Sequence, residues 1–125
     1  MFTKIYNKLV RDNIPNIIKE NGNECETRIL KNDEYKEELD RKLNEEFLEY
    51  KEEGAVEELA DMLEVIYAIG KLKGFSEEEL NKIREEKAER RGRFDNKIFL
   101  VSASTKDWNI FLGGSLWDTK TGLDV

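Results

Sequence analysis

The segment from Glu58 to Ile69 constrains the fold of this chain more than any other part. Nine of its twelve residues are apolar, and the exceptions recur at every third position, as Glu58, Asp61 and Glu64. At about 100° per residue, these three acids share one ~120° sector of a helix whose remaining surface is apolar. This pattern is typical of a buried helix, because a surface helix needs only one apolar face. Buried carboxylates repel one another, so we expect a cation to meet this acidic stripe.

Hydrophobic periodicity, glycines and capping residues predict four helices, and hence an all-α fold of the helical-bundle type. Pro15 suits the first turn of a helix, Gly54 marks a tight turn, and Ser76 with Glu79 forms a capping box. The expected helices cover about residues 13–20, 32–52, 56–73 and 76–91. The side chains expected to cap the first two are Asp12 or Asn13, and Asn32 or Asp33.

The chain changes character after Gly92. Two short β-prone runs follow, at residues 97–101 and 108–112, and residues 113–125 are polar and contain glycine. This pattern predicts a short C-terminal β-hairpin or an extended tail. An alternative is that residues 110–115 open a second, α/β domain that is cut off in this chain.

Composition narrows the classes of protein. A length of 125 residues suits one domain with at most a short appendage. The net charge of −7, from 28 acids and 21 bases, argues against a partner that is a nucleic acid. No run approaches the ~20 apolar residues of a membrane span, and no signal peptide is visible, so we expect a cytoplasmic protein without a membrane partner. The absence of histidine and the single cysteine leave carboxylates as the candidate metal ligands.

The helix before the acidic stripe supplies a matching pair of carboxylates, Glu46 and Glu49. If the two helices fold back antiparallel about Gly54, residues whose numbers add to the same value lie level, so Glu49 faces Glu58 and Glu46 faces Asp61. Four converging carboxylates form a hard-oxygen site that suits Mg²⁺ or Mn²⁺. Because Mg²⁺ completes its shell with substrate phosphates, a phosphorylated small molecule is the expected ligand. Glu-x-x-Glu pairs also occur by chance on solvated helix faces. The position of Glu58 and Asp61 on a helix that is otherwise apolar, together with the level pairing, favours a site over that alternative.

These carboxylates belong to two motifs, EEFLE at residues 45–49 and EELAD at residues 57–61. With them, the chain resembles the all-α NTP pyrophosphohydrolase superfamily, which includes the MazG-like and phosphoribosyl-ATP pyrophosphohydrolase-like proteins. It is also similar to a small MazG-like subgroup through YNKLVRD at residues 6–12 and RGRF at residues 91–94. The resemblance implies a MazG-like helical domain over residues 1–101. Residues 102–125 have no counterpart and form a tail of unknown role.

The resemblance implies an enzyme that hydrolyses a nucleoside triphosphate to a nucleoside monophosphate and pyrophosphate with Mg²⁺, and so removes non-standard or surplus nucleotides. The residues that match the metal ligands of the family are Glu46, Glu49, Glu58 and Asp61. Glu49 is the candidate to orient or deprotonate the attacking water through the metal, with Glu45 in reserve.

Basic residues are expected to bind the triphosphate. Lys8 and Arg11 lie in the matched opening motif, and Lys87 and Arg91 lie near the end of the fourth helix. The alternative for the first two is an ordinary ion pair with nearby acids. For the other two, the helix dipole alone favours bases at a helix C-terminus.

Three questions of function and assembly stay open at this point. The substrate could be phosphoribosyl-ATP, as in histidine synthesis, or the chain could be a helical module that binds a metal or nucleotide without hydrolysing it. A second subunit is expected, because the predicted central helix has more apolar surface than one short chain can cover. The resemblance implies a homodimer or a homotetramer. The face expected to meet a second subunit comprises Met62, Ile66 and Ile69, extended by Val65 and Ala68.

Overall fold

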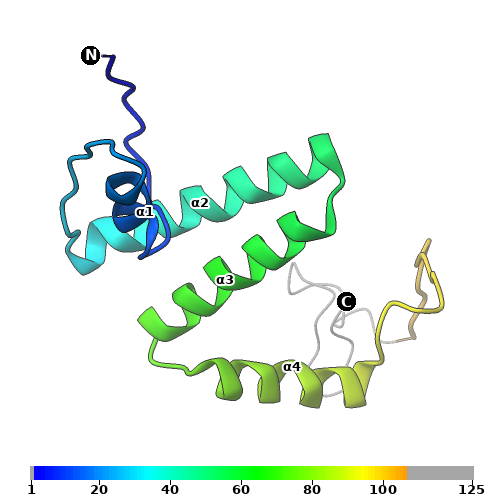
Figure 1. Ribbon diagram of the computed structural model, residues 1–125. Coiled ribbons are helices and arrows are strands. Elements are labelled where there is room, and N and C mark those ends of the chain that lie inside the picture. Colours follow the sequence, from blue (N-terminus) through cyan, green and yellow to red (C-terminus); the bar gives the residue numbers. More distant parts are fainter. Residues whose placement is uncertain (1, 107–125) are drawn as a thin grey trace. The chain divides into compact units, whose positions relative to one another are not determined.

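The structure is a computed structural model in which residues 2–106 are described. The chain divides into two units, Met1–Arg91 and Gly92–Val125, and the first unit contains all the described helices (Figure 1). These are α1 (Ile14–Glu20), α2 (Asn32–Glu53), α3 (Val56–Leu72) and α4 (Glu77–Arg91). The predicted all-α fold is confirmed, and the helices begin and end within about one residue of the expected positions.

Helices α2 and α3 form an antiparallel hairpin that is the centre of the first unit (Figure 1). Gly54 ends α2 with a φ of 68°, in the left-handed region that glycine adopts without a steric penalty. Its N–H donates to the carbonyl of Tyr50 at 2.7 Å, which satisfies one of the free carbonyls at the end of α2. The turn therefore sets the register in which the carboxylates of the two helices face each other.

The helix caps follow the prediction only in part. At α4, the N–H of Glu79 donates to Ser76 Oγ at 3.1 Å and the N–H of Ser76 donates to Glu79 Oε1 at 3.3 Å, which is the expected capping box. Asn13 precedes α1 but does not cap it, because its φ and ψ of −87° and −8° are already helical. The expected cap of α2 is wrong as well, since Lys31 occupies the N-cap position and its side chain has no acceptor atom.

Helix α4 packs against the last turns of α3. A Cβ atom at Gly70 would lie 3.4 Å from Leu80 Cδ2, so glycine allows the two helices to approach closely. Nearby, the side-chain amide nitrogen of Asn81 donates a hydrogen bond to the phenol oxygen of Tyr67 at 3.2 Å. These contacts lie at the end of α3 that is remote from its first turn.

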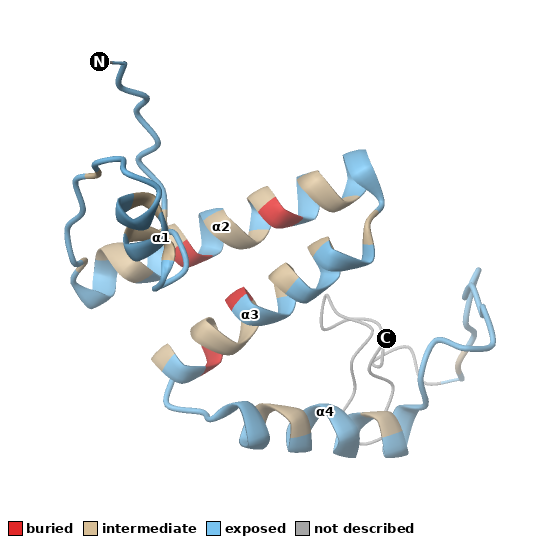
Figure 2. Ribbon diagram, viewed as in Figure 1, coloured by how far each residue is buried: buried red, intermediate tan, exposed pale blue. Residues whose placement is uncertain are grey.

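The buried core of the described residues is small (Figure 2). Leu39 of α2 and Val65 of α3 are its buried apolar side chains, and Glu46 is the buried charged one. Much apolar surface therefore stays exposed in a single chain. None of the helices in residues 2–106 has the length and apolar character that a membrane crossing requires.

The apolar face of α3 that lies open differs from the expected one. The residues expected to face a second subunit are half-buried or buried, and they are Met62, Val65, Ile66, Ala68 and Ile69. Val56, Leu59 and Leu63 are exposed instead. The reason is rotational: Met62, Val65 and Ile69 lie within about 40° of Glu58, which faces α2, whereas Leu59 and Leu63 lie about 100° to 140° away.

In the second unit, residues 92–106 form no helix and no strand. The chain turns at residues 94–97, where the N–H of Lys97 donates to the carbonyl of Phe94 at 3.3 Å. The first β-prone run, residues 97–101, is exposed and is not part of a strand. The second run, at 108–112, and the start of the alternative α/β domain at residue 110 lie outside the described residues.

Candidate metal centre

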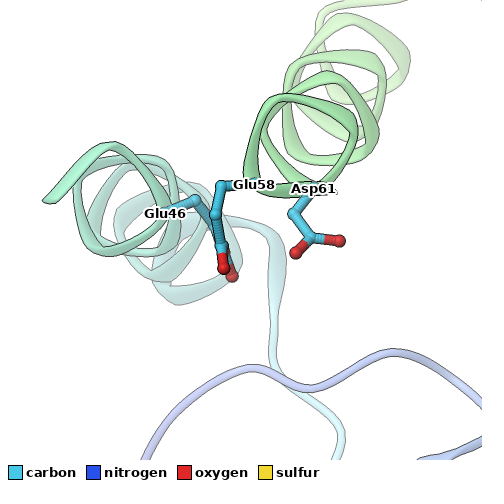
Figure 3. A group of neighbouring side chains, drawn as sticks. All are labelled: Glu46, Glu58 and Asp61. Atoms are coloured by element: carbon cyan, nitrogen blue, oxygen red, sulfur yellow. The ribbon is translucent and has the colours of Figure 1, made fainter. Parts of the chain in front are cut away.

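Three carboxylates converge on one side of the α2–α3 hairpin. Glu46 comes from α2, Glu58 and Asp61 come from α3, and each offers an oxygen within 4.8 Å of the others. Figure 3 shows the three side chains pointing toward the same side, where the N-terminal segment (faint blue) passes. The predicted level pairing of Glu46 with Asp61 thus agrees with the geometry. A cluster of three carboxylates at this separation could hold a metal ion.

Among the described residues, two carboxylate oxygens of this cluster are buried and have no hydrogen-bond partner. Glu46 is 6% exposed, and its Oε1 lies 3.3 Å from Lys42 Nζ, while its Oε2 is buried without a hydrogen bond. Glu58 Oε2 is likewise buried and unpaired among the described residues. Buried polar atoms in native proteins nearly always have a hydrogen-bond partner, because an unpaired atom loses its hydrogen bonds to water without gaining another. The donor set therefore fits a hard cation that takes oxygen ligands.

The pKa of Glu58 reports the same accumulation of negative charge. Burial is the largest cause that raises the pKa of this carboxyl to about 7, and the charge of Glu49 and a hydrogen bond with it raise the pKa further. Glu53 and Asp61 add smaller repulsions. Near neutral pH and without a cation, a substantial fraction of the molecules therefore carries a proton on Glu58, whereas an ordinary glutamate is ionised.

Glu49 and Glu45, the two predicted catalytic carboxylates, occupy different surroundings. Glu49 is a neighbour of Glu58, as the level pairing predicts, although it is not one of the three converging ligands. Glu45 Oε1 accepts a hydrogen bond from Lys8 Nζ at 2.8 Å and lies 3.6 Å from Lys42 Nζ. The hydrogen bond from Lys8 is the main cause that lowers the pKa of Glu45. Glu45 is therefore a neutralised, ion-paired carboxylate.

The N-terminal segment brings two bases to the cluster. Arg11 Nη2 lies 2.6 Å from Asp61 Oδ1, and Lys8 pairs with Glu45 as described above. The hydrogen bond with Glu45 raises the pKa of Lys8, and its attraction to Glu49 and Glu46 acts in the same direction. The structure thus places both predicted phosphate-binding bases of the opening motif beside the carboxylates.

The other two predicted bases, Lys87 and Arg91, lie in the last turns of α4. Among the helices, α4 packs only against α3, and its contacts through Leu80 and Asn81 fall at the end of α3 opposite to the carboxylates. The described contacts do not bring these two bases to the cluster. Their role in phosphate binding stays a prediction.

Lys42 is a member of the site that the sequence-based interpretation missed. It lies one turn before the carboxylates on α2 and approaches both Glu45 and Glu46, at 3.6 Å and 3.3 Å. The signal was present, because residues three and four apart share a helix face. Lys42 offsets part of the charge of Glu46 and leaves the second oxygen of that carboxylate available.

Comparison of the chain with protein-family models, with curated proteins and with solved structures found no match. The fold and the cluster define an all-α protein with a carboxylate site that could hold a metal ion. The superfamily named above remains a resemblance carried by the motifs at residues 45–49 and 57–61.

Proposed function

We propose that the protein is a Mg²⁺-dependent nucleoside triphosphate pyrophosphohydrolase, which converts a nucleoside triphosphate and water to a nucleoside monophosphate and pyrophosphate. The observation that carries this proposal is the convergence of Glu46, Glu58 and Asp61 beside two bases of the N-terminal segment. Phosphoryl transfer depends on neutralising the negative charge of the phosphates. Here, carboxylates could hold a metal ion for this purpose, and basic side chains could bind the phosphates directly. The motif resemblance supports the same reaction.

Each carboxylate has a role that its surroundings support. Glu46, Glu58 and Asp61 would hold the ion, because their oxygens converge and a buried oxygen of Glu46 and one of Glu58 have no partner in residues 2–106. Such an ion supplies charge neutralisation for phosphate oxygens and makes a bound water more acidic. Glu49, next to Glu58, is the proposed fourth ligand or the group that orients the attacking water. Glu45 is assigned to holding Lys8 rather than to proton transfer.

The bases are proposed to bind the triphosphate. Arg11 presents a planar guanidinium that can bind two phosphate oxygens at once, and Lys8, three residues earlier in the chain, presents a compact charge. Both side chains are partly exposed, so an incoming ligand can reach them. Because the net charge of the protein is −7, these local bases are needed to bring a polyanion to an acidic site.

The exposed face formed by Val56, Leu59 and Leu63 is proposed to bind a second copy of the chain. A core with two buried apolar residues is small for four helices, and a two-fold contact would cover the open face of α3 with the same face of its partner. A homodimer is the simplest assembly of this kind, and a homotetramer is the larger alternative.

The test is the release of pyrophosphate by the purified chain with Mg²⁺ across standard nucleoside triphosphates, base-modified nucleotides and phosphoribosyl-ATP. We expect turnover of at least one nucleoside triphosphate and its loss in Asp61→Asn. Glu52→Gln is the matched control, because Glu52 is an exposed acid of α2 outside the cluster. Preference for phosphoribosyl-ATP would assign the chain to histidine synthesis. Metal binding without any turnover would make it a non-catalytic binding module.

A further inference from the structure

We propose that the N-terminal segment, residues 6–11, is a cation strap that occupies the carboxylate cluster before the metal arrives. In this state Arg11 neutralises Asp61 and Lys8 neutralises Glu45. When the ion enters, Arg11 leaves Asp61 and, together with Lys8, binds the phosphates of the substrate. The inference rests on the proposed function and adds an order of events to it.

The position of Arg11 carries the first step. Its Nη2 lies 2.6 Å from Asp61 Oδ1, and Asp61 is one of the three residues whose oxygens converge. A divalent ion held by the same carboxylate would repel a guanidinium at this distance. Arg11 and the ion therefore compete for Asp61, and binding of one weakens binding of the other.

Because the strap is exposed to solvent, its ion pairs can be broken at a small cost in free energy. The side chain of Arg11 is 58% exposed and that of Lys8 is 37% exposed, and ion pairs open to solvent contribute little to stability. The backbone adds little resistance, since residues 2–10 make no backbone–backbone hydrogen bond within the described part of the chain. The first anchor is the N–H of Ile14, which donates to the carbonyl of Arg11 at 3.0 Å.

The backbone conformation of Asn7, the residue before Lys8, is consistent with a strap whose side chains can change partners. Asn7 adopts a φ of 47°, a left-handed conformation that asparagine tolerates better than most residues. Asn7 and the start of α1 thus bracket the two bases. Between these points the side chains can move from carboxylate to phosphate without disturbing a helix.

Competition between Arg11 and the ion predicts that one variant, Arg11→Gln, gains affinity for the metal ion and loses affinity for phosphate. Arg11→Gln removes the competitor of the ion, so the full-length protein should bind Mn²⁺ alone about fivefold more tightly than the wild type. The same variant loses a phosphate contact, so inorganic pyrophosphate in the presence of saturating Mn²⁺ should bind at least about fivefold more weakly. A merely structural role of Arg11 would weaken both.

The experiment is calorimetric titration of Mn²⁺, followed by titration of pyrophosphate. Arg28→Gln is the matched control, because Arg28 pairs with Glu34 and no contact joins it to the cluster in the described residues. Arg11→Lys keeps the charge and should bind Mn²⁺ as the wild type does. If Arg11→Gln loses its helical circular dichroism, Lys8→Gln replaces it, with a smaller gain in Mn²⁺ affinity expected.

The outcomes separate the two proposals. Tighter Mn²⁺ binding with weaker pyrophosphate binding supports the strap. Equal or weaker Mn²⁺ binding by the folded Arg11→Gln variant overturns the strap and leaves the metal site standing. If neither the wild type nor the variant binds Mn²⁺, both the strap and the proposed function are wrong.

Discussion

Glu46 and Asp61 lie on different helices, yet their carboxylate oxygens come within 4.8 Å of each other. The turn at Gly54 makes this possible, because it folds α3 back on α2 in the register that sets the two residues level. Glu58 joins them from the first turn of α3. The local geometry of one hairpin thus builds the whole candidate ligand set.

The carboxylates of this set, and the neighbouring Glu49, should be essential for turnover but not for folding. We expect Glu46→Gln, Glu49→Gln, Glu58→Gln or Asp61→Asn each to reduce turnover by about two orders of magnitude or more. Circular dichroism should show that the helices persist. Near-normal turnover of Asp61→Asn at saturating Mg²⁺ would show that the site is assigned wrongly.

The raised pKa of Glu58 predicts how the stability of the metal-free protein depends on pH. The pKa is about 7 in the folded chain and 4.5 in the unfolded reference, so between these values the folded state binds more protons. The contribution of this group to the free energy of unfolding therefore falls as pH rises from about 4.5 to about 7, and it is constant above that range. Urea unfolding with a chelator at several pH values measures this, relative to Glu58→Gln. An identical pH profile for wild type and variant would contradict the prediction.

Mg²⁺ should stabilise the folded chain. An ion that binds only the folded state adds about 2.7 kcal/mol to the free energy of unfolding at one hundred times its Kd. The melting temperature should therefore rise with Mg²⁺ concentration, and the rise should vanish in Asp61→Asn. Glu52→Gln should respond as the wild type does. A melting temperature that ignores Mg²⁺ in the wild type would count against metal binding.

The turn at Gly54 should tolerate few side chains. Its φ of 68° lies in the region that most residues adopt only with strain, so Gly54→Ala should lower the free energy of unfolding by about 1 kcal/mol. Gly54→Asn should lose less, because asparagine visits this region more readily. Urea unfolding of both variants provides the comparison. Equal stability of Gly54→Ala and the wild type would mean that this turn does not require a left-handed residue.

The open face of α3 predicts the assembly. Light scattering at micromolar concentration should give at least twice the chain mass of 14.7 kDa. Leu63→Lys should shift the mass toward the monomer, because it places a charge in the proposed contact. Ile29→Lys is the control, since Ile29 is almost fully exposed in the link between α1 and α2. A monomeric wild type would contradict the proposed use of this face.

The helices and the carboxylate register could be predicted because they depend on local signals. The periodicity of residues 58–69, the capping box at Ser76 and the glycine at position 54 each act over a few residues. Once the hairpin is drawn, the level pairing of Glu46 with Asp61 follows from the rise per residue of two antiparallel helices. The caps predicted at Asn13 and Asn32 are not formed, which shows a limit of local sequence signals. A side chain caps a helix only if its backbone angles are suitable, and residue type alone does not determine those angles.

The partners of Lys8 and Arg11 could not be predicted in the same way. These bases lie 37 and 50 residues from Glu45 and Asp61 in the sequence, in a segment without helical or strand periodicity. Their contacts depend on how an irregular segment crosses two helices. The open face of α3 was wrongly predicted for a related reason, because the rotation of a helix that is apolar all round is decided by its neighbours rather than by its own pattern.

The most direct measurement is the identity of the products when the wild type and Mg²⁺ act on a nucleoside triphosphate, followed by chromatography and a pyrophosphate assay. We predict a nucleoside monophosphate and pyrophosphate in equal amounts, and no reaction with a chelator or with Asp61→Asn. A nucleoside diphosphate with inorganic phosphate, or no product from any triphosphate, would contradict the proposed pyrophosphohydrolase.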